Sequence, residues 1–112
     1  MKKFVSMLLA LVMVFALCAC GSKTEGGDKA ESIKVGFICL HDENSTYDKN
    51  FIDAAKAACK NAGLSEDQYI IKPNIPEGQE CYNAAAELVD AGCNVVFADS
   101  FGHEDFMIQA AK

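Results

Sequence analysis

The sequence predicts an α/β fold in which three strands of a parallel sheet alternate with three helices. Residues 33–40 and 94–98 are almost wholly apolar, as expected of strands covered on both faces, and residues 69–75 form a further strand between two turns. Apolar residues recur three and four positions apart, the spacing of one helix face, in residues 48–62, 79–91 and 103–112. This alternation is typical of parallel sheets with right-handed crossovers, so we expect a three-layer αβα arrangement.

The first strand and the helix after it are the most strongly patterned part of the chain. The strand runs into a polar, acidic loop at residues 41–47, and the helix carries one apolar stripe: Phe51, Ala54, Ala55, Ala58, Cys59 and Ala62. Ser45 and Thr46 are both suitable caps for this helix, and Gly63 is a suitable stop. Ligands bind beyond the carboxyl ends of strands in open parallel sheets, so this loop is the first candidate for function.

Pro73 indicates where the second strand lies in the sheet. It falls inside residues 69–75 and cannot donate a hydrogen bond to a neighbouring strand, which confines this strand to an edge. The predicted order is second, first, third, and the chain reverses direction between the first and third strands. The loops after these two strands, residues 41–48 and 99–102, are expected to face each other there.

The other two helices also have one apolar face each. The second helix ends at Gly92 and carries its stripe at Cys81, Ala84, Ala85, Leu88 and Ala91. In the third helix four residues are expected to point inward: Phe106, Met107, Ala110 and Ala111.

Residues 1–19 have the pattern of an export signal, and residues 20–32 that of a flexible tether. Two lysines precede an apolar run over residues 4–17, which is shorter than the roughly 20 residues that a membrane-spanning helix needs. A membrane anchor helix is the alternative. The segment Leu17-Cys18-Ala19-Cys20 resembles a bacterial lipobox, in which the position of Cys20 is lipidated after cleavage. We therefore expect acyl chains on Cys20 to hold the protein at the outer face of the cytoplasmic membrane.

The charge of the mature chain argues against nucleic acid as a partner. Cleavage before Cys20 would remove two of the ten basic residues and leave all sixteen acidic ones, for a net charge of −8. Such a chain has no electrostatic footprint for nucleic acid and should repel anionic lipid. The acyl anchor, rather than surface charge, would then hold it at the membrane.

Four cysteines remain beyond the predicted anchor. They form neither a CxxC pair nor a zinc pattern, although export would permit disulfides. We expect small buried hydrophobes, with redox or metal chemistry as the alternative, at Cys39, Cys59, Cys81 and Cys93.

The third strand has the composition of an interior strand, yet the sequence supplies no fourth strand to cover its free edge. An open apolar edge promotes aggregation. The third helix also stops without a cap. We therefore expect residues 33–112 to be the incomplete first lobe of a larger protein.

Two loop motifs resemble those of the basic membrane protein (BMP) family of substrate-binding lipoproteins. In the loop after the first strand, four residues match the family's spacing: Asp42, Asp48, Lys49 and Phe51. Asn50 replaces the family's usual serine, and the family's loop glycines are absent. The second motif is Ala-Asp-Ser-Phe-Gly at residues 98–102, after the third strand. The resemblance covers the whole chain, while the family's proteins are considerably longer.

The resemblance implies a periplasmic-binding-protein-like fold of type I with two α/β lobes. Residues 33–112 would be part of the N-terminal lobe of this substrate-binding domain. It also implies the membrane-anchored, extracytoplasmic component of an ABC importer, which works with a permease and its ATPase subunit. Several family members bind purine nucleosides. Such proteins capture a solute without chemistry, so we expect a monomer without enzyme activity, cofactor or metal.

Aromatic side chains are needed to hold a flat base, because stacking on one ring is worth about 1–3 kcal/mol. The resemblance implies Phe51 as the stacking residue. Its position at the head of an apolar stripe, taken alone, favours a place in the core. Tyr47 and Phe101, one in each loop, are further candidates for stacking.

Polar side chains of the same loops are candidates for hydrogen bonds to a solute. Ionised Asp42 could accept hydrogen bonds from ribose hydroxyls. Asp48 is either a ligand-binding residue or a capping residue in the first turn of the helix. Asp99 and Ser100 follow directly after the third strand, where binding residues are common. The lone histidines, His41 and His103, are assigned no chemistry.

Three other functions are compatible with the same residues. Asp42 and Glu43 near Asp99 also resemble the acidic residues of a phosphoryl-accepting receiver domain, although such domains work inside the cell. No GxGxxG, GxSxG, P-loop or HExxH motif is present. The second alternative is a sensor or adhesion lobe that shares the fold without feeding a transporter. The third is a binding protein for a sugar or another small molecule.

Overall fold

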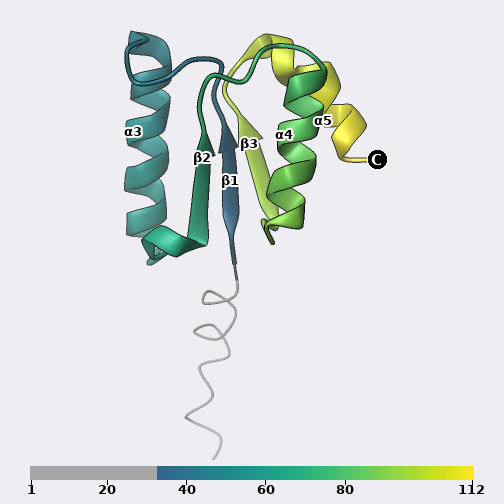
Figure 1. Ribbon diagram of the computed structural model, residues 1–112. Helices are drawn as coiled ribbons and strands as arrows, with labels where there is room; N and C mark the ends of the chain where they lie inside the picture. Colours follow the sequence, from purple (N-terminus) through teal and green to yellow (C-terminus); the bar gives the residue numbers. More distant parts are fainter. Residues whose placement is uncertain (1–32) are drawn as a thin grey trace, which may run out of the picture.

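The computed structural model describes residues 33–112, and the predicted signal, the predicted lipidation site Cys20 and the predicted tether lie outside these residues. The described chain forms a three-layer αβα lobe around a three-stranded parallel sheet (Figure 1). The strands are β1 (Val35–Ile38), β2 (Tyr69–Lys72) and β3 (Val95–Ala98). Their order is β2-β1-β3, with Val35 opposite Tyr69 on one side and opposite Val95 on the other. The predicted fold class and strand order are confirmed.

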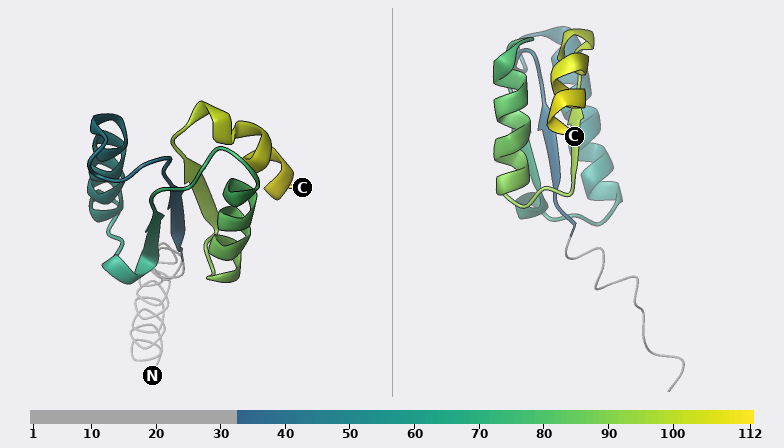
Figure 2. Two further views of the ribbon diagram at one scale, coloured as in Figure 1. Left: turned by 45° about the horizontal axis from the view of Figure 1, so that its top comes forward. Right: turned by 90° about the vertical axis from the view of Figure 1, so that its right-hand side faces the viewer.

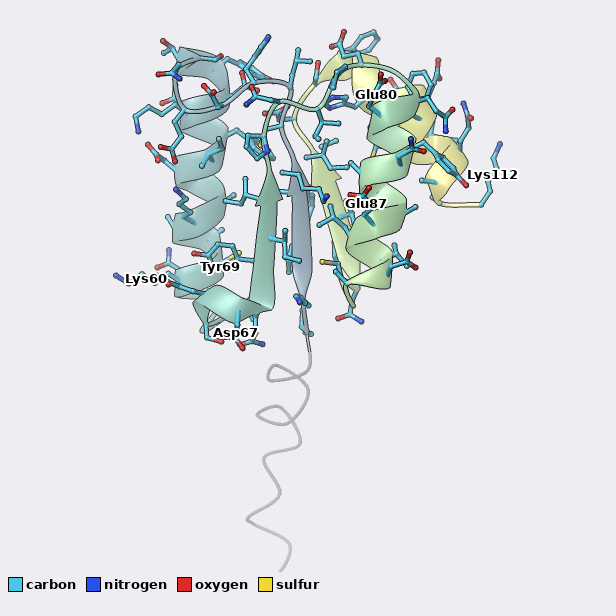
Figure 3. All side chains as sticks on the ribbon, viewed as in Figure 1. Lys60, Asp67, Tyr69, Glu80, Glu87 and Lys112 are labelled. Carbon is cyan, nitrogen blue, oxygen red and sulfur yellow. The ribbon has the colours of Figure 1, made fainter. Side chains whose placement is uncertain are left out.

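The helices divide between the two faces of the sheet. One face is covered by α3 (Thr46–Asn61), and the other by α4 (Gln79–Asp90) and α5 (Glu104–Ala110) (Figures 1 and 2). Two 3₁₀ turns, η1 (Glu66–Gln68) and η2 (Phe101–His103), lead into β2 and α5. Figure 3 shows side chains filling the space between the sheet and the helices on both sides.

The residues predicted to start and stop the two long helices lie at the helix ends in the structure. Ser45 is the N-cap of α3, and its hydroxyl oxygen accepts the backbone N–H of Asp48 at 3.4 Å. After α3 and α4 the chain turns at Gly63 and Gly92, whose φ angles of 78° and 92° suit glycine. These residues therefore fix the ends of both long helices.

Several details of the predicted elements are wrong, among them the predicted inward position of Ala91, which is exposed after the end of α4. Pro73 lies directly after β2, which ends at Lys72, and not inside the strand as predicted. The strand is nevertheless at the edge of the sheet, because β2 pairs only with β1. Ala111 is exposed, because α5 starts only after η2 and ends at Ala110. The other predicted inward residues of this helix, Phe106, Met107 and Ala110, are partly buried against the core.

Each face of the sheet has its own core. The larger core lies under α4 and consists of Ile38, Cys81, Ala84, Ala85, Leu88 and Cys93. The smaller core lies under α3 and consists of Val35, Phe37, Ala55 and Cys59. Three predicted core positions of α3 are exposed, because they line an open hollow with Phe97 of β3: Ala54, Ala58 and Ala62. The four cysteines of the described chain are buried and unpaired, as expected of small hydrophobes.

Candidate functional site

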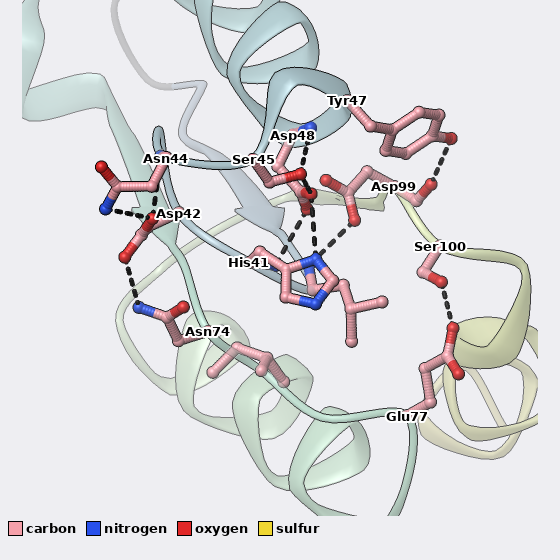
Figure 4. Close-up of polar contacts among 12 residues, drawn as sticks. His41, Asp42, Asn44, Ser45, Tyr47, Asp48, Asn74, Glu77, Asp99 and Ser100 are labelled. Atoms are coloured by element: carbon pink, nitrogen blue, oxygen red, sulfur yellow. Dashed lines mark hydrogen bonds and ion pairs between the residues drawn. The ribbon is translucent and has the colours of Figure 1, made fainter.

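The two predicted loops meet at the carboxyl end of β1, where consecutive backbone amides bind two aspartates (Figure 4). The N–H of Leu40 donates to Asp99 Oδ1 at 3.0 Å, and the N–H of His41 donates to Asp48 Oδ1 at 2.9 Å. One carboxyl group comes from the first turn of α3 and the other from the end of β3. The predicted juxtaposition of residues 41–48 and 99–102 at the point where the chain reverses direction is therefore present.

Asp48 is almost completely buried, with 1% of its surface exposed. Its Oδ2 accepts the Ser45 hydroxyl at 2.6 Å and lies 3.1 Å from Nδ1 of the His41 ring. Burial by itself raises the pKa of this carboxyl group, but the hydrogen bonds from Ser45 and from the backbone of His41 outweigh it and hold the pKa below its ordinary value. Asp48 is thus an ionised residue at the head of α3.

Asp99 is the second buried carboxyl group, with 8% of its surface exposed. Its backbone carbonyl accepts the hydroxyl of Tyr47 at 2.9 Å, which joins the two loops a second time. Its Oδ2 is buried and has no hydrogen-bond partner among the described residues. Burial raises the pKa of Asp99 above its ordinary value, and the neighbouring Asp48 raises it further, against the opposing hydrogen bonds from Leu40 and from the thiol of Cys39.

Two aromatic rings of the same loops stand in solvent. Tyr47 is 68% exposed although its hydroxyl is bonded, and Phe101 is 90% exposed. Ser100, between Asp99 and Phe101, donates a hydrogen bond to the carboxylate of Glu77 in the β2–α4 connection. A solute that reaches this edge of the sheet would therefore meet two ring faces and a hydroxyl group.

Asp42 lies in the same loop but on the side of β2. Its carboxylate accepts the backbone and side-chain amides of Asn44, each at 2.9 Å, and the side-chain amide of Asn74 at 3.3 Å. These hydrogen bonds, led by the backbone amide of Asn44, hold the pKa of Asp42 below its ordinary value. Asp42 also borders an open cavity of about 460 Å³ between the loop, α3 and β2.

Phe51 belongs to a different surface. Its ring packs edge-on against Phe37 of β1, with centroids 6.2 Å apart, and it borders the apolar hollow of about 390 Å³ between α3 and β3. The structure thus brings together Tyr47, Asp48, Asp99 and Ser100, with Asp42 on one flank (Figure 4). Phe101 follows Ser100 in the chain, and Phe51 lies in the wall under α3.

Several partners in this site escaped the sequence analysis. His41 supplies both a backbone donor and a ring nitrogen to Asp48, and Glu77 holds Ser100. The spacing of Ser45 and Asp48 is that of a capping motif, which could have indicated their mutual contact. No local signal in the sequence links Glu77 to Ser100, because the two residues belong to different connections.

The four cysteines of the described part of the chain are buried and unpaired. Burial, followed by the nearby Asp99, raises the pKa of the Cys39 thiol to about 12. Within residues 33–112, no group of three or more histidine, cysteine or acidic side chains is arranged to hold a metal ion. None of the helices in this range is long and apolar enough to cross a membrane.

No family model matches the sequence, and no characterised protein is significantly similar to it.

Proposed function

We propose that the protein is the membrane-anchored, extracytoplasmic solute-binding component of an ABC importer, and that its solute is a purine nucleoside. The observation that carries this proposal is the pair of exposed rings, Tyr47 and Phe101, beside two buried carboxyl groups at the reversal point of a parallel sheet. Exposed aromatic side chains on loops held by buried polar contacts are suited to binding a flat, polar solute.

Each group has a separate role in this proposal. The rings of Tyr47 and Phe101 stack on the base, and Asp42 accepts hydrogen bonds from ribose. Asp99 holds the two loops together through the N–H of Leu40, and Asp48 closes the first loop through the N–H of His41. Direct contact of a solute with the Asp48 carboxylate requires the exchange of one of its internal hydrogen bonds.

Residues 33–112 form one flank of the proposed site. The type I periplasmic-binding-protein-like fold implied by the loop motifs has a second lobe, and closure of the two lobes buries the solute. The closed form then docks on the permease, and its ATPase subunit drives transport. The protein itself captures and releases the solute, and it changes no bond in it.

The proposal is tested by a nuclear magnetic resonance titration of the labelled protein with adenosine, guanosine and a sugar. A single flank offers stacking worth about 1–3 kcal/mol per ring, and 1 mM affinity corresponds to about 4 kcal/mol. We therefore expect a dissociation constant on the order of 1 mM for nucleosides, with shifts confined to residues 41–48 and 99–102. Tyr47→Ala and Phe101→Ala should weaken binding, whereas Tyr82→Ala, which removes an exposed ring of α4, should leave it unchanged.

Two results would contradict the proposal in different ways. Shifts at the same residues with the sugar but not with nucleosides would assign the site to another solute, as in the sugar-binding or sensory alternative. No shifts at these residues with any solute would remove the site. The receiver-like alternative is not favoured by the burial of Asp99, because a phosphoryl-accepting carboxylate must be reached by its donor.

The acyl anchor is tested separately, by feeding expressing cells a fatty-acid analogue that can be detected on the protein. We expect the label on the wild-type protein and on Cys18→Ala, and its loss in Cys20→Ala, because Cys20 is at the lipidated position of the motif. An unlabelled wild-type protein that still partitions with membranes would support the anchor-helix alternative.

A further inference from the structure

The buried carboxyl groups of Asp48 and Asp99 have unequal hydrogen bonding, although they lie side by side. Asp48 accepts three hydrogen bonds or ionic contacts: the N–H of His41 at 2.9 Å, the hydroxyl of Ser45 at 2.6 Å and the His41 ring at 3.1 Å. Asp99 accepts the N–H of Leu40 at 3.0 Å through Oδ1, and the thiol of Cys39, a weak donor, faces the same side chain. Its buried Oδ2 has no hydrogen-bond partner among residues 33–112. An ionised carboxylate in this position would leave a charged oxygen unpaired in a buried site, which is costly.

We propose that Asp48 and Asp99 share one proton, carried on Oδ2 of Asp99 and donated to the carboxylate of Asp48, and that this proton fastens the β1–α3 loop to the start of the β3–η2 connection. The two side chains accept hydrogen bonds from the amides of Leu40 and His41, just after β1, and lie within hydrogen-bonding reach of each other. A protonated carboxyl group has a donor as well as an acceptor, so Oδ2 of Asp99 gains a partner. Two buried carboxylates in contact cannot both ionise without strong repulsion.

The groups around the pair do not supply an alternative positive charge to Asp99. The thiol of Cys39, the imidazole of His41 and the hydroxyl of Tyr47 face the pair, and Glu77 contacts the adjacent Ser100. The ring of His41 contacts Asp48 through Nδ1, which lies 3.1 Å from Oδ2 of Asp48. Every lysine ion pair in the described chain involves other carboxylates, namely those of Asp53, Glu43 and Glu87.

Burial and the neighbouring Asp48 raise the pKa of Asp99, as a retained proton requires. An unfolded aspartate titrates near pH 4, at about 3.9. Between that value and the higher folded pKa of Asp99, the folded protein holds a proton that the unfolded chain has lost. Stability therefore falls as the pH rises through this window, and the unfolding equilibrium constant increases about tenfold per pH unit. The lowered pKa of Asp48 acts only below about pH 4, where stability falls as the pH falls.

Replacement of Asp99 by asparagine tests the proton directly. In Asp99→Asn the side-chain oxygen can still accept the N–H of Leu40 while the amide donates to Asp48, so the variant imitates the protonated acid. We expect the wild-type protein to lose stability with rising pH above about pH 4, and Asp99→Asn to lose that dependence. The control Asp53→Asn changes an exposed carboxylate of α3 and should keep the wild-type slope.

A second measurement holds even if a variant fails to fold. Carbon NMR of the wild-type carboxyl groups should show Asp99 titrating above its ordinary range while Asp48 stays ionised. Titration of Asp99 at or below about pH 4, or equal pH slopes in the wild type and Asp99→Asn, would overturn the shared proton. Loss of the slope in Asp48→Asn instead of Asp99→Asn would also overturn it. The shared proton is measurable whether or not the protein binds a nucleoside.

Discussion

The two faces of the sheet carry similar apolar residues but are closed to different degrees. On the face covered by α4, Ile38 and Leu88 are completely buried. A Cβ atom on Gly36 of β1 would come within 2.8 Å of Leu88 Cδ1, so this glycine lets α4 lie close to the sheet. Two helices, α4 and α5, contribute to the same core.

The face covered by α3 is closed over β1 and β2 only. Phe37 is buried there, whereas its stacked neighbour Phe97 of β3 is 50% exposed at a centroid distance of 5.6 Å. Val95 is also exposed, and the alanines of α3 that look toward β3 border an open hollow. One helix is too narrow to cover three strands. An apolar stripe therefore shows which side of a helix faces the sheet, but it does not show whether a second helix covers the remaining strand.

The largest expected effect is on the closed face, at Leu88. Leu88→Ala should lower the free energy of unfolding by about 2–5 kcal/mol, because it leaves a cavity against Ile38 and Gly36 that the close packing cannot fill. Urea unfolding followed by circular dichroism measures the change. The neighbouring control Val89→Ala, at an exposed position, should cost less than about 1 kcal/mol. Equal losses in the two variants would mean that the α4 face is not the better-packed one.

A smaller effect is expected on the open face, at Phe97. Phe97→Ser should lower the free energy of unfolding by about 1 kcal/mol, because it removes one ring of a stacked pair that is already half in solvent. The same change should reduce the fluorescence of a dye that binds exposed apolar surface. A loss as large as that of Leu88→Ala, or undiminished dye binding, would contradict the description of this face as open.

Much of the architecture could be predicted because it depends on local patterns. Apolar runs and helical spacing predicted the α/β class, and Ser45, Gly63 and Gly92 set helix ends by their own conformational preferences. The strand order is correct although Pro73 lies one residue beyond β2, since a proline at the end of a strand and one inside it both favour an edge. Ala54 was predicted to be buried but is exposed, because the spacing of apolar residues in a helix does not show how much of the helix surface the sheet covers.

Local residue patterns are enough to predict the class of fold, the two loops at the carboxyl edge, and the acidic and aromatic residue types in them. The folded chain is needed to show that Asp48 and Asp99 are buried neighbours, that His41 contacts Asp48, and that the ring of Phe51 packs on Phe37. The physical reason is that charge, burial and hydrogen bonding depend on groups brought together from distant parts of the chain. A single aspartate in the sequence carries no sign of the second carboxyl group that makes one of the pair retain a proton.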